Sequence, residues 1–317
     1  CAHLTMVCHK DGVGDQYMSR PVILLELNEV NFDHLQVYAA SGDTPHLQRL
    51  VEAHGISKTT SERNYEELEP WIQWVTAHTG KTLTEHGVFR LGDIVNHDIA
   101  QIWERLEDQG LRVGAVGPMN AKNRTRNAAF FVPDPWTPTS VTGSVLSRRL
   151  YGAIAQAVND NARSRVTPAS IVWLLAGLAR YGRPVNYRLY ARLAAKIGRK
   201  PWYKAMFLDL LLADVFVHET HNKAPDFVSL FLNGAAHIQH HYMFNCRAYR
   251  GPRRNPEWYI SPAEDPVGEV YKLYDRIVGQ ILGAFPSARL LIATGLHQNP
   301  HQDVTFYWRL MDHAAFF

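Results

Sequence analysis

Short apolar runs that end in polar residues recur along the chain, and they carry the first prediction about its fold. Four such runs are almost continuously apolar: residues 22–27, 111–117, 227–233 and 288–294. Runs of this length are typical of parallel strands that helices cover on both faces. Helical patterns lie between or beside them: residues 44–53, 70–78, 98–109 and 267–285. This alternation predicts an α/β fold with a central, mostly parallel sheet flanked by helices.

The middle of the chain, residues 141–224, differs from the rest. It has helical periodicity and almost no strand signal, and it holds 13 Lys and Arg residues against 4 Asp and Glu residues. The segment therefore carries about +9, while the remainder of the chain carries −6. We interpret it as a helical insertion that caps a site for an anionic substrate, or else as a solvated basic face. We interpret its Leu, Ala and Trp stripes as core rather than as a membrane contact. A lipid-linked substrate is a further alternative.

Length and composition bound the class of protein. With 317 residues, the chain is long enough for one large domain or two modest ones. A net charge of +3 is too small to indicate a nucleic-acid partner. Three cysteines, Cys1, Cys8 and Cys246, form no disulfide framework, which favours a reducing, cytoplasmic location. We expect neither a signal peptide nor a transmembrane segment, because no apolar run has the length or continuity of either.

The two ends of the chain call for separate expectations. Residues 1–17 show no periodicity, and Met18 stands just before the first predicted strand. We therefore expect residues 1–17 to be a non-native or disordered leader, with the α/β domain spanning residues 18–317 and the helical insertion at residues 141–224. The pattern of residues 305–310 predicts a further strand close to the end of the sequence. We therefore expect that the natural chain extends past Phe317.

Histidines follow two of the predicted strands. His237 and His241 come after residues 227–233, and His297 comes after residues 288–294. In open α/β sheets, ligands bind outside the carboxyl ends of the strands, where distant parts of the sequence meet. His237 and His241 are four residues apart, which places both on one face of a helix. This arrangement predicts a metal or acid–base site; hydrogen bonding in a purely structural role is the alternative.

Other polar residues lie at comparable positions. Glu29 follows the first strand, and Glu69 precedes Pro70 at a predicted helix start, where a carboxylate can also stabilise the helix dipole. Asn120 and Lys122 follow the strand at residues 111–117, and they suit recognition of substrate oxygens as well as ordinary capping. Glu29 and Glu69 are therefore candidates for activating water or binding a cation, and Asn120 and Lys122 for binding substrate.

The order of these motifs resembles the alkaline phosphatase superfamily, in its phosphodiesterase and sulfatase branch. Residues 79–88 have the spacing of that branch's Thr-Gly…His-Gly segment. Asn28 stands where the family has its first metal-binding Asp, Asn233 and His237 have its Asp-x-x-x-His spacing, and Leu296-His297 replaces its Asp-His. The resemblance covers residues 21–125 and 225–300, and it implies two divalent cations and a phosphate or sulfate ester as substrate.

Departures from the family pattern change the expected chemistry. Asn28, Asn233 and Leu296 replace three Asp ligands, and the nucleophile position falls on Pro70, which has no hydroxyl or thiol. Asn keeps an oxygen ligand but loses a charge, which weakens binding of hard cations. We therefore expect one zinc or manganese ion rather than two cations. The predicted ligands are Asn28, Asn233, His237, His241 and His297.

The leading hypothesis is a metal-dependent hydrolase or transferase that acts on a phosphate or sulfate ester. Its substrate is predicted to be an anionic small molecule or glycan, attacked directly by metal-bound water, with Glu29 or Glu69 as a further ligand or as the group that activates water. The alternative is a catalytically inactive relative that binds an anionic glycan, a lipid-linked sugar or a nucleotide. A dinucleotide-binding enzyme ranks lower, because no glycine-rich fingerprint follows the first strand. The sequence does not determine the substrate, the metal or the oligomeric state.

Overall fold

A seven-stranded sheet runs through the middle of the molecule. The computed structural model describes residues 5–8, 21–160 and 166–301. The strand order is β3-β1-β7-β2-β6-β4-β5, and the last five of these strands are parallel. The two remaining strands pair antiparallel at one edge. The strands are β1 (Thr5–Cys8), β2 (Val22–Leu27), β3 (Ser57–Lys58), β4 (Val113–Val116), β5 (Phe130–Val132), β6 (Phe227–Leu232) and β7 (Arg289–Ala293).

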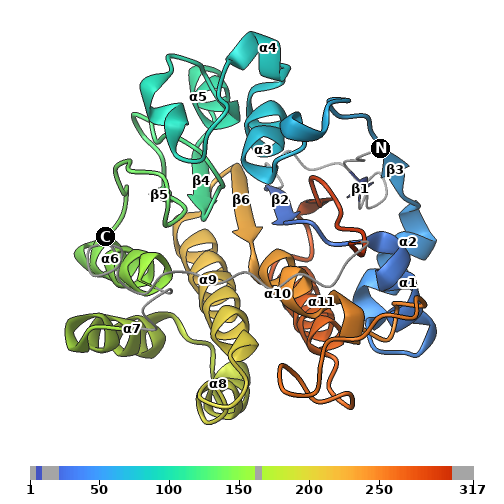
Figure 1. The fold of residues 1–317 in the computed structure, drawn as a ribbon. Coiled ribbons are helices and arrows are strands. Elements are labelled where there is room, and N and C mark those ends of the chain that lie inside the picture. Colours follow the sequence, from blue (N-terminus) through green and yellow to red (C-terminus); the bar gives the residue numbers. More distant parts are fainter. Residues whose placement is uncertain (1–4, 9–20, 161–165, 302–317) are drawn as a thin grey trace, which may run out of the picture.

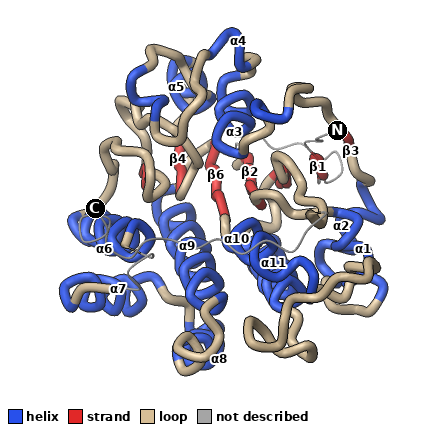
Figure 2. The backbone as a smooth tube through the Cα atoms, in the orientation of Figure 1, coloured by secondary structure: helices blue, strands red, loops and turns tan. Residues whose placement is uncertain are grey.

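Helices cover both faces of this sheet, as Figures 1 and 2 show. One face is covered by α3 (Pro70–Thr79) and α5 (Ile102–Asp108), with α4 (Leu83–His86) beside α3. The other face is covered by α1 (Phe32–Ala40), α2 (Pro45–His54), α9 (Trp202–Lys223), α10 (Gly234–Tyr242) and α11 (Pro266–Ala284). The predicted α/β fold with a mostly parallel sheet and flanking helices is therefore confirmed.

The alternation of side chains along β6 explains why both faces need helices. Phe227, Ser229 and Phe231 point to the α3 and α5 face, where Trp103 Nε1 donates to Ser229 Oγ at 3.2 Å. Val228, Leu230 and Leu232 belong to the large core on the opposite face. Successive residues of a strand point to opposite faces, so a strand that is apolar throughout must be covered twice.

The predicted helical insertion contains α6 (Val145–Asn159), α7 (Pro168–Tyr181), α8 (Tyr187–Ala194) and α9. Within its described residues the segment has no strand, as predicted. Its last helix, α9, packs directly on β6 and β4 and contributes Met206, Leu210 and Phe216 to the main core. Thus α9 is part of the layer that covers the sheet, while α6, α7 and α8 lie farther out (Figure 1).

Most residues for which the predictions about the chain ends were made lie outside the described part of the structure. Within residues 1–17, four residues form β1, which lies between β3 and β7, and the other residues lie outside the described part. The strand predicted at residues 305–310 also lies outside it. Among the helices described, none combines the length and apolar character needed to cross a bilayer.

Candidate functional site

Two asparagines join the carboxyl ends of the two central strands. Asn28 follows β2 and Asn233 follows β6, and Asn28 Nδ2 donates to Asn233 Oδ1 at 2.7 Å. On α3, Trp74 Nε1 donates to Asn28 Oδ1, also at 2.7 Å. Asn28 is fully buried. The two residues predicted as oxygen ligands are thus adjacent, but their amides already hydrogen-bond to each other and to an indole.

Glu29, the next residue, is held in an unusual backbone conformation. Its φ is +58°, in the left-handed region that side chains other than glycine rarely adopt. Its N–H donates to the Thr294 carbonyl oxygen at 2.9 Å, and its own carbonyl oxygen accepts from Gln239 Nε2 at 2.9 Å. Strain of this kind persists only where surrounding contacts impose it, and it clusters at functional sites. Here it directs a buried carboxyl group to the edge of the sheet.

The Glu29 carboxyl group lies between one amide and one imidazole. Gln298, beyond β7, donates from Nε2 to Glu29 Oε2, and His240 Nε2, on α10, lies 3.6 Å from the same oxygen. The Glu29 side chain is 5% exposed and the His240 side chain is 64% exposed. Burial raises the pKa of Glu29, the nearby His240 and Gln298 oppose this rise, and Glu69 adds to it. The site therefore joins a carboxyl group whose pKa is raised to an imidazole that faces solvent.

Glu69 completes this cluster from the other side. It is the N-cap residue of α3, directly before Pro70 at the first helical position, as the sequence predicts. Its side chain makes no capping hydrogen bond. Burial raises the pKa of Glu69, while the nearby His240 lowers it. His240 therefore interacts electrostatically with both carboxyl groups, which repel each other.

A buried hydrogen-bond chain holds the cluster in place. Tyr271 on α11 donates from its hydroxyl to Gln239 Oε1 at 2.6 Å and accepts from the Asn31 backbone N–H at 2.9 Å. Asn31 Nδ2 in turn donates to the Gln298 carbonyl oxygen at 2.9 Å. Gln239 also donates a hydrogen bond to the Glu29 carbonyl oxygen, so these bonds connect α10, α11 and the loops after β2 and β7. Side chains fixed by such a network are positioned before any substrate binds.

Two of the three histidines predicted as ligands lie on α10, and the third follows β7. His237 and His241 lie on the exposed side of α10 with ring centroids 5.1 Å apart, and His241 Nδ1 hydrogen-bonds to the Tyr259 hydroxyl at 2.7 Å. His297 is half-buried near His34 on α1; burial lowers the pKa of His34, and His297 lowers it further. The histidine described beside Glu29 is His240, and metal binding by His237, His241 and His297 stays a prediction.

Asn120 and Lys122, the predicted substrate-binding pair, make contacts within the protein. The Asn120 amide donates to the carbonyl oxygens of Trp71 and Arg90 and accepts from the Gly92 N–H. Lys122 Nζ donates to the Val95 carbonyl oxygen at 2.7 Å. These bonds tie the loop after β4 to the segment after α3. The role of both residues in substrate binding remains a prediction that these contacts do not support.

Glu26, the other carboxylate near the end of β2, points to a different place. Its Oε1 lies 2.8 Å from His78 Nε2 on α3, and both side chains are buried. His78 packs between Trp74 and Trp103. Glu26 therefore lies under α3, and Glu29 is the carboxylate at the edge of the sheet.

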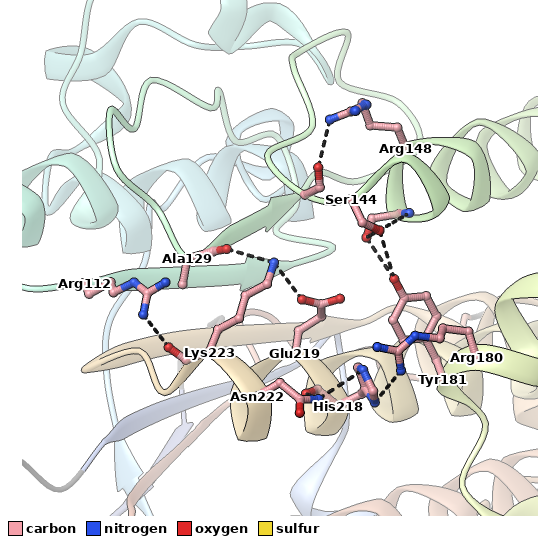
Figure 3. Close-up of polar contacts among 12 residues, drawn as sticks. Arg112, Ala129, Ser144, Arg148, Arg180, Tyr181, His218, Glu219, Asn222 and Lys223 are labelled. Atoms are coloured by element: carbon pink, nitrogen blue, oxygen red, sulfur yellow. Dashed lines mark hydrogen bonds and ion pairs between the residues drawn. The ribbon is translucent and has the colours of Figure 1, made fainter.

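Two cavities lie elsewhere in the molecule. One, of about 410 Å³, lies between α6, α7 and α9, where Ser144, Arg180, His218 and Lys223 are among its lining residues (Figure 3). Another, of about 350 Å³, lies beside Pro21 and the end of α9. Both adjoin residues that precede strands, namely Pro21 before β2 and Lys223 before β6, whereas the Glu29 cluster follows strands.

The donors at the carboxyl edge do not fit the two divalent cations that the family resemblance implies. Across the described residues, no three His, Cys, Asp or Glu side chains gather closely enough to hold a metal ion. Asn28 and Asn233 are neutral, and their amides are used in internal hydrogen bonds. Hard cations need several oxygen ligands with negative charge. The single zinc or manganese ion remains a prediction.

Sequence reasoning missed three members of the site: His240, Gln298 and Trp74. For His240 a signal was available, because it lies seven residues after Asn233 and residues at this spacing share a helical face. Nothing local distinguishes Gln298 or Trp74, since each gains its role from a partner far away in the sequence. The sequence predicts four residues that the structure places at this edge of the sheet: Asn28, Glu29, Glu69 and Asn233.

Comparison with known proteins finds distant likenesses among solved structures alone. No family model matches the chain, and no curated protein matches it. Among solved structures, it is similar to phosphonoacetate hydrolase from Sinorhizobium meliloti 1021, determined in complex with phosphonoacetate, with a TM-score of 0.42 and 12% sequence identity. The alignment covers 84% of this chain and 54% of that one, so the chain spans about half the length of that structure. The fold class rests on the strand order itself rather than on this likeness.

Proposed function

We propose that this chain is a hydrolase that cleaves a phosphate or sulfate ester at the carboxyl edge of its sheet. The observation that carries the proposal is the cluster of Glu29, His240 and Glu69 in front of β2 and β6. Two carboxyl groups with raised pKa values around one imidazole form the kind of set that moves protons near neutral pH. The resemblance to the alkaline phosphatase superfamily supports an ester of this class.

The roles follow from burial. Glu29 is buried and oriented by Gln298, so in its ionised form it takes a proton from an attacking water molecule. His240 is largely exposed and within reach of a substrate from solvent, so in this proposal its protonated form donates a proton to the departing alcohol oxygen. The phosphorus– or sulfur–oxygen bond to the alcohol breaks as the bond to the water oxygen forms. Ester and water thereby yield the free acid anion and the alcohol, and the proton on Glu29 returns to His240 through solvent.

The surroundings support an anionic substrate in one respect and oppose it in another. The first turn of α3 lies beside the cluster, and the positive end of a helix dipole attracts anions. The two carboxylates repel an anion when both are ionised, and their raised pKa values reduce this repulsion. Anion binding should therefore favour the protonation state in which one of the two carries a proton.

The first test is a substrate panel with the purified chain. Aryl phosphate, aryl phosphodiester and aryl sulfate are each assayed with chelator, with added zinc and with added manganese. Turnover of one class, with ¹⁸O from labelled water in the released anion, supports the proposal. Turnover only with an added cation would support the sequence-based metal prediction and would require a different mechanism. No turnover of any class under any condition would contradict the proposal.

A second candidate function is a non-catalytic binder of an anionic glycan, lipid-linked sugar or nucleotide. The bonds among Trp74, Asn28 and Asn233 favour it, because they use the family's ligand positions for packing. This alternative predicts that such an anion raises the thermal stability of the chain without being converted. Calorimetry with product analysis distinguishes the two functions.

A further inference from the structure

The outer face of α7 is apolar along its whole length, although the helix lies at the margin of the molecule (Figure 1). Ile171, Val172 and Leu175 are 47%, 59% and 60% exposed. Pro168, Ala169 and Ala179 are also exposed, and no charged residue occurs between Pro168 and Ala179. The sequence-based interpretation of these stripes as core is therefore wrong for this face of α7.

The opposite side of α7 is already occupied. Gly177 faces the Leu150 side chain on α6, and the Tyr181 hydroxyl hydrogen-bonds to Ser147 Oγ at 3.0 Å. A surface helix normally has polar residues on the side away from the core. Here the solvent side is apolar as well, so α7 has a second face that a further partner can cover.

The charges around this face have one sign. Arg148, Arg149 and Arg180 are exposed, and the Arg149 guanidinium lies over the Trp173 ring of α7, 5.7 Å from its centroid. On α8, which follows α7 in the chain, Arg188 and Arg192 are exposed too. Residues 141–224 as a whole carry about +9.

Three of the four acidic residues of this segment are buried. In the described part of residues 141–224, Asp209, Asp214 and Glu219 are 4%, 1% and 6% exposed. Asp209 accepts from Tyr274, Asp214 accepts from Tyr190, and Glu219 pairs with Lys223 (Figure 3). The remaining acid, Asp160, accepts from Gln156. The outer surface of the segment therefore combines apolar and cationic side chains.

We propose that the outer face of α7, with the exposed arginines of α6 and α7 beside it, docks on the surface of a membrane that contains anionic lipids. Apolar side chains enter the boundary between headgroups and acyl chains, and arginines pair with lipid phosphates. Charge complementarity selects this partner, because two copies of the same cationic face repel each other, and a nucleic acid leaves Ile171, Val172 and Leu175 uncovered. The inference is independent of the proposed ester hydrolysis.

The test is co-sedimentation of the full chain with vesicles. Vesicles of phosphatidylcholine and phosphatidylglycerol in a roughly 3:1 ratio are compared with vesicles of phosphatidylcholine alone. The double variant V172Q/L175Q removes apolar area while keeping good helix-forming residues. Phe89→Gln is the matched control, because Phe89 is 50% exposed and follows α4 in the chain, and α4 lies far from α7 (Figure 1). Circular dichroism checks that both variants fold.

We expect binding to the anionic vesicles only, weakened by roughly tenfold or more in V172Q/L175Q and unchanged in Phe89→Gln. Added salt and the variant R148Q/R149Q should weaken binding as well. Three results overturn the proposal: no binding to anionic vesicles, equal binding of V172Q/L175Q, or equal binding to phosphatidylcholine alone. A dimer in light scattering that V172Q/L175Q abolishes, without vesicle binding, would assign this face to a second copy instead.

Discussion

The Nε2 atom of His240 lies 3.6 Å from the Oε2 atom of Glu29, where α10 meets the end of β2. One partner is buried and the other faces solvent. A substrate that approaches from solvent meets the imidazole first and the carboxyl group behind it. This order of groups is the basis for assigning water activation to Glu29 and proton donation to His240.

Replacing Gln298 by Leu should shift the pH profile of hydrolysis. Gln298 donates a hydrogen bond to Glu29, and this bond lowers the pKa of Glu29 against the effect of burial. Its loss raises that pKa further, so a higher pH is needed to ionise the base. The acid limb of the kcat/KM profile should therefore move to higher pH, whereas the exposed-site variant Gln109→Leu should leave it in place. An acid limb that stays fixed or moves to lower pH contradicts the assignment of Glu29 as base.

Replacing Asn28 and Asn233 by Asp should make the stability of the protein depend on a bound cation. In N28D/N233D, two negative charges meet where an amide pair is now joined at 2.7 Å. Without a cation they repel each other, and with zinc or manganese they gain charged oxygen ligands. We expect a lower melting temperature in chelator and a larger rise with added metal than in the wild type. Asn222→Asp, at an exposed position, is the control. An equal rise in melting temperature with metal in the wild type, N28D/N233D and Asn222→Asp would contradict the claim that the amides of Asn28 and Asn233 disfavour cation binding.

Trp74→Phe should destabilise the fold at the site. Trp74 is 1% exposed, packs against Phe231 and donates the hydrogen bond that satisfies the buried Asn28 oxygen. Leaving a buried acceptor without a partner costs about 1–3 kcal/mol, and the smaller ring adds a cavity cost. Urea unfolding should show this loss, while Trp258→Phe, at a residue 68% exposed, should change stability little. A stable Trp74→Phe protein would mean that the indole hydrogen bond is dispensable.

Asp209 should make stability depend on pH. Burial raises its pKa to about 6, and it accepts from the Tyr274 hydroxyl and the Gly234 N–H at the start of α10. Because the folded-state pKa lies above the unfolded one, this group contributes stability at low pH that is lost as pH rises from about 4 to about 6. The loss amounts to about 3 kcal/mol. In urea unfolding, the free energy of unfolding of Asp209→Asn should lack this part of the pH dependence. If the free energy of unfolding changes equally with pH in the wild type and in Asp209→Asn, the assignment to Asp209 is wrong.

Much of the fold was predictable because its signals are local. The strands β2, β6 and β7 come from almost continuous apolar runs, and α3 begins at Pro70 after Glu69 as its sequence indicates. The short edge strands β3 and β5 lack such a signal, since two or three residues form strands only because a neighbour pairs with them.

The site was predictable in position more than in composition. Strand ends located Asn28, Glu29 and Asn233 correctly at one edge. The spacing of His237 and His241 predicts that both share one helical face, but it does not predict which histidine of α10 lies beside Glu29. The phase of α10 relative to Glu29 decides which histidine faces the carboxylate, and that phase follows from tertiary bonds such as the one from Gln239 to the Glu29 backbone.

The most direct test of the central claim is the activity of Glu29→Gln, measured on whichever ester the wild type hydrolyses. Gln keeps the shape of the side chain but cannot take a proton from water. We predict a fall in kcat of about 10²- to 10⁴-fold with KM little changed, and no such fall for Glu66→Gln at a neighbouring exposed position. Full activity of a folded Glu29→Gln protein would contradict the account.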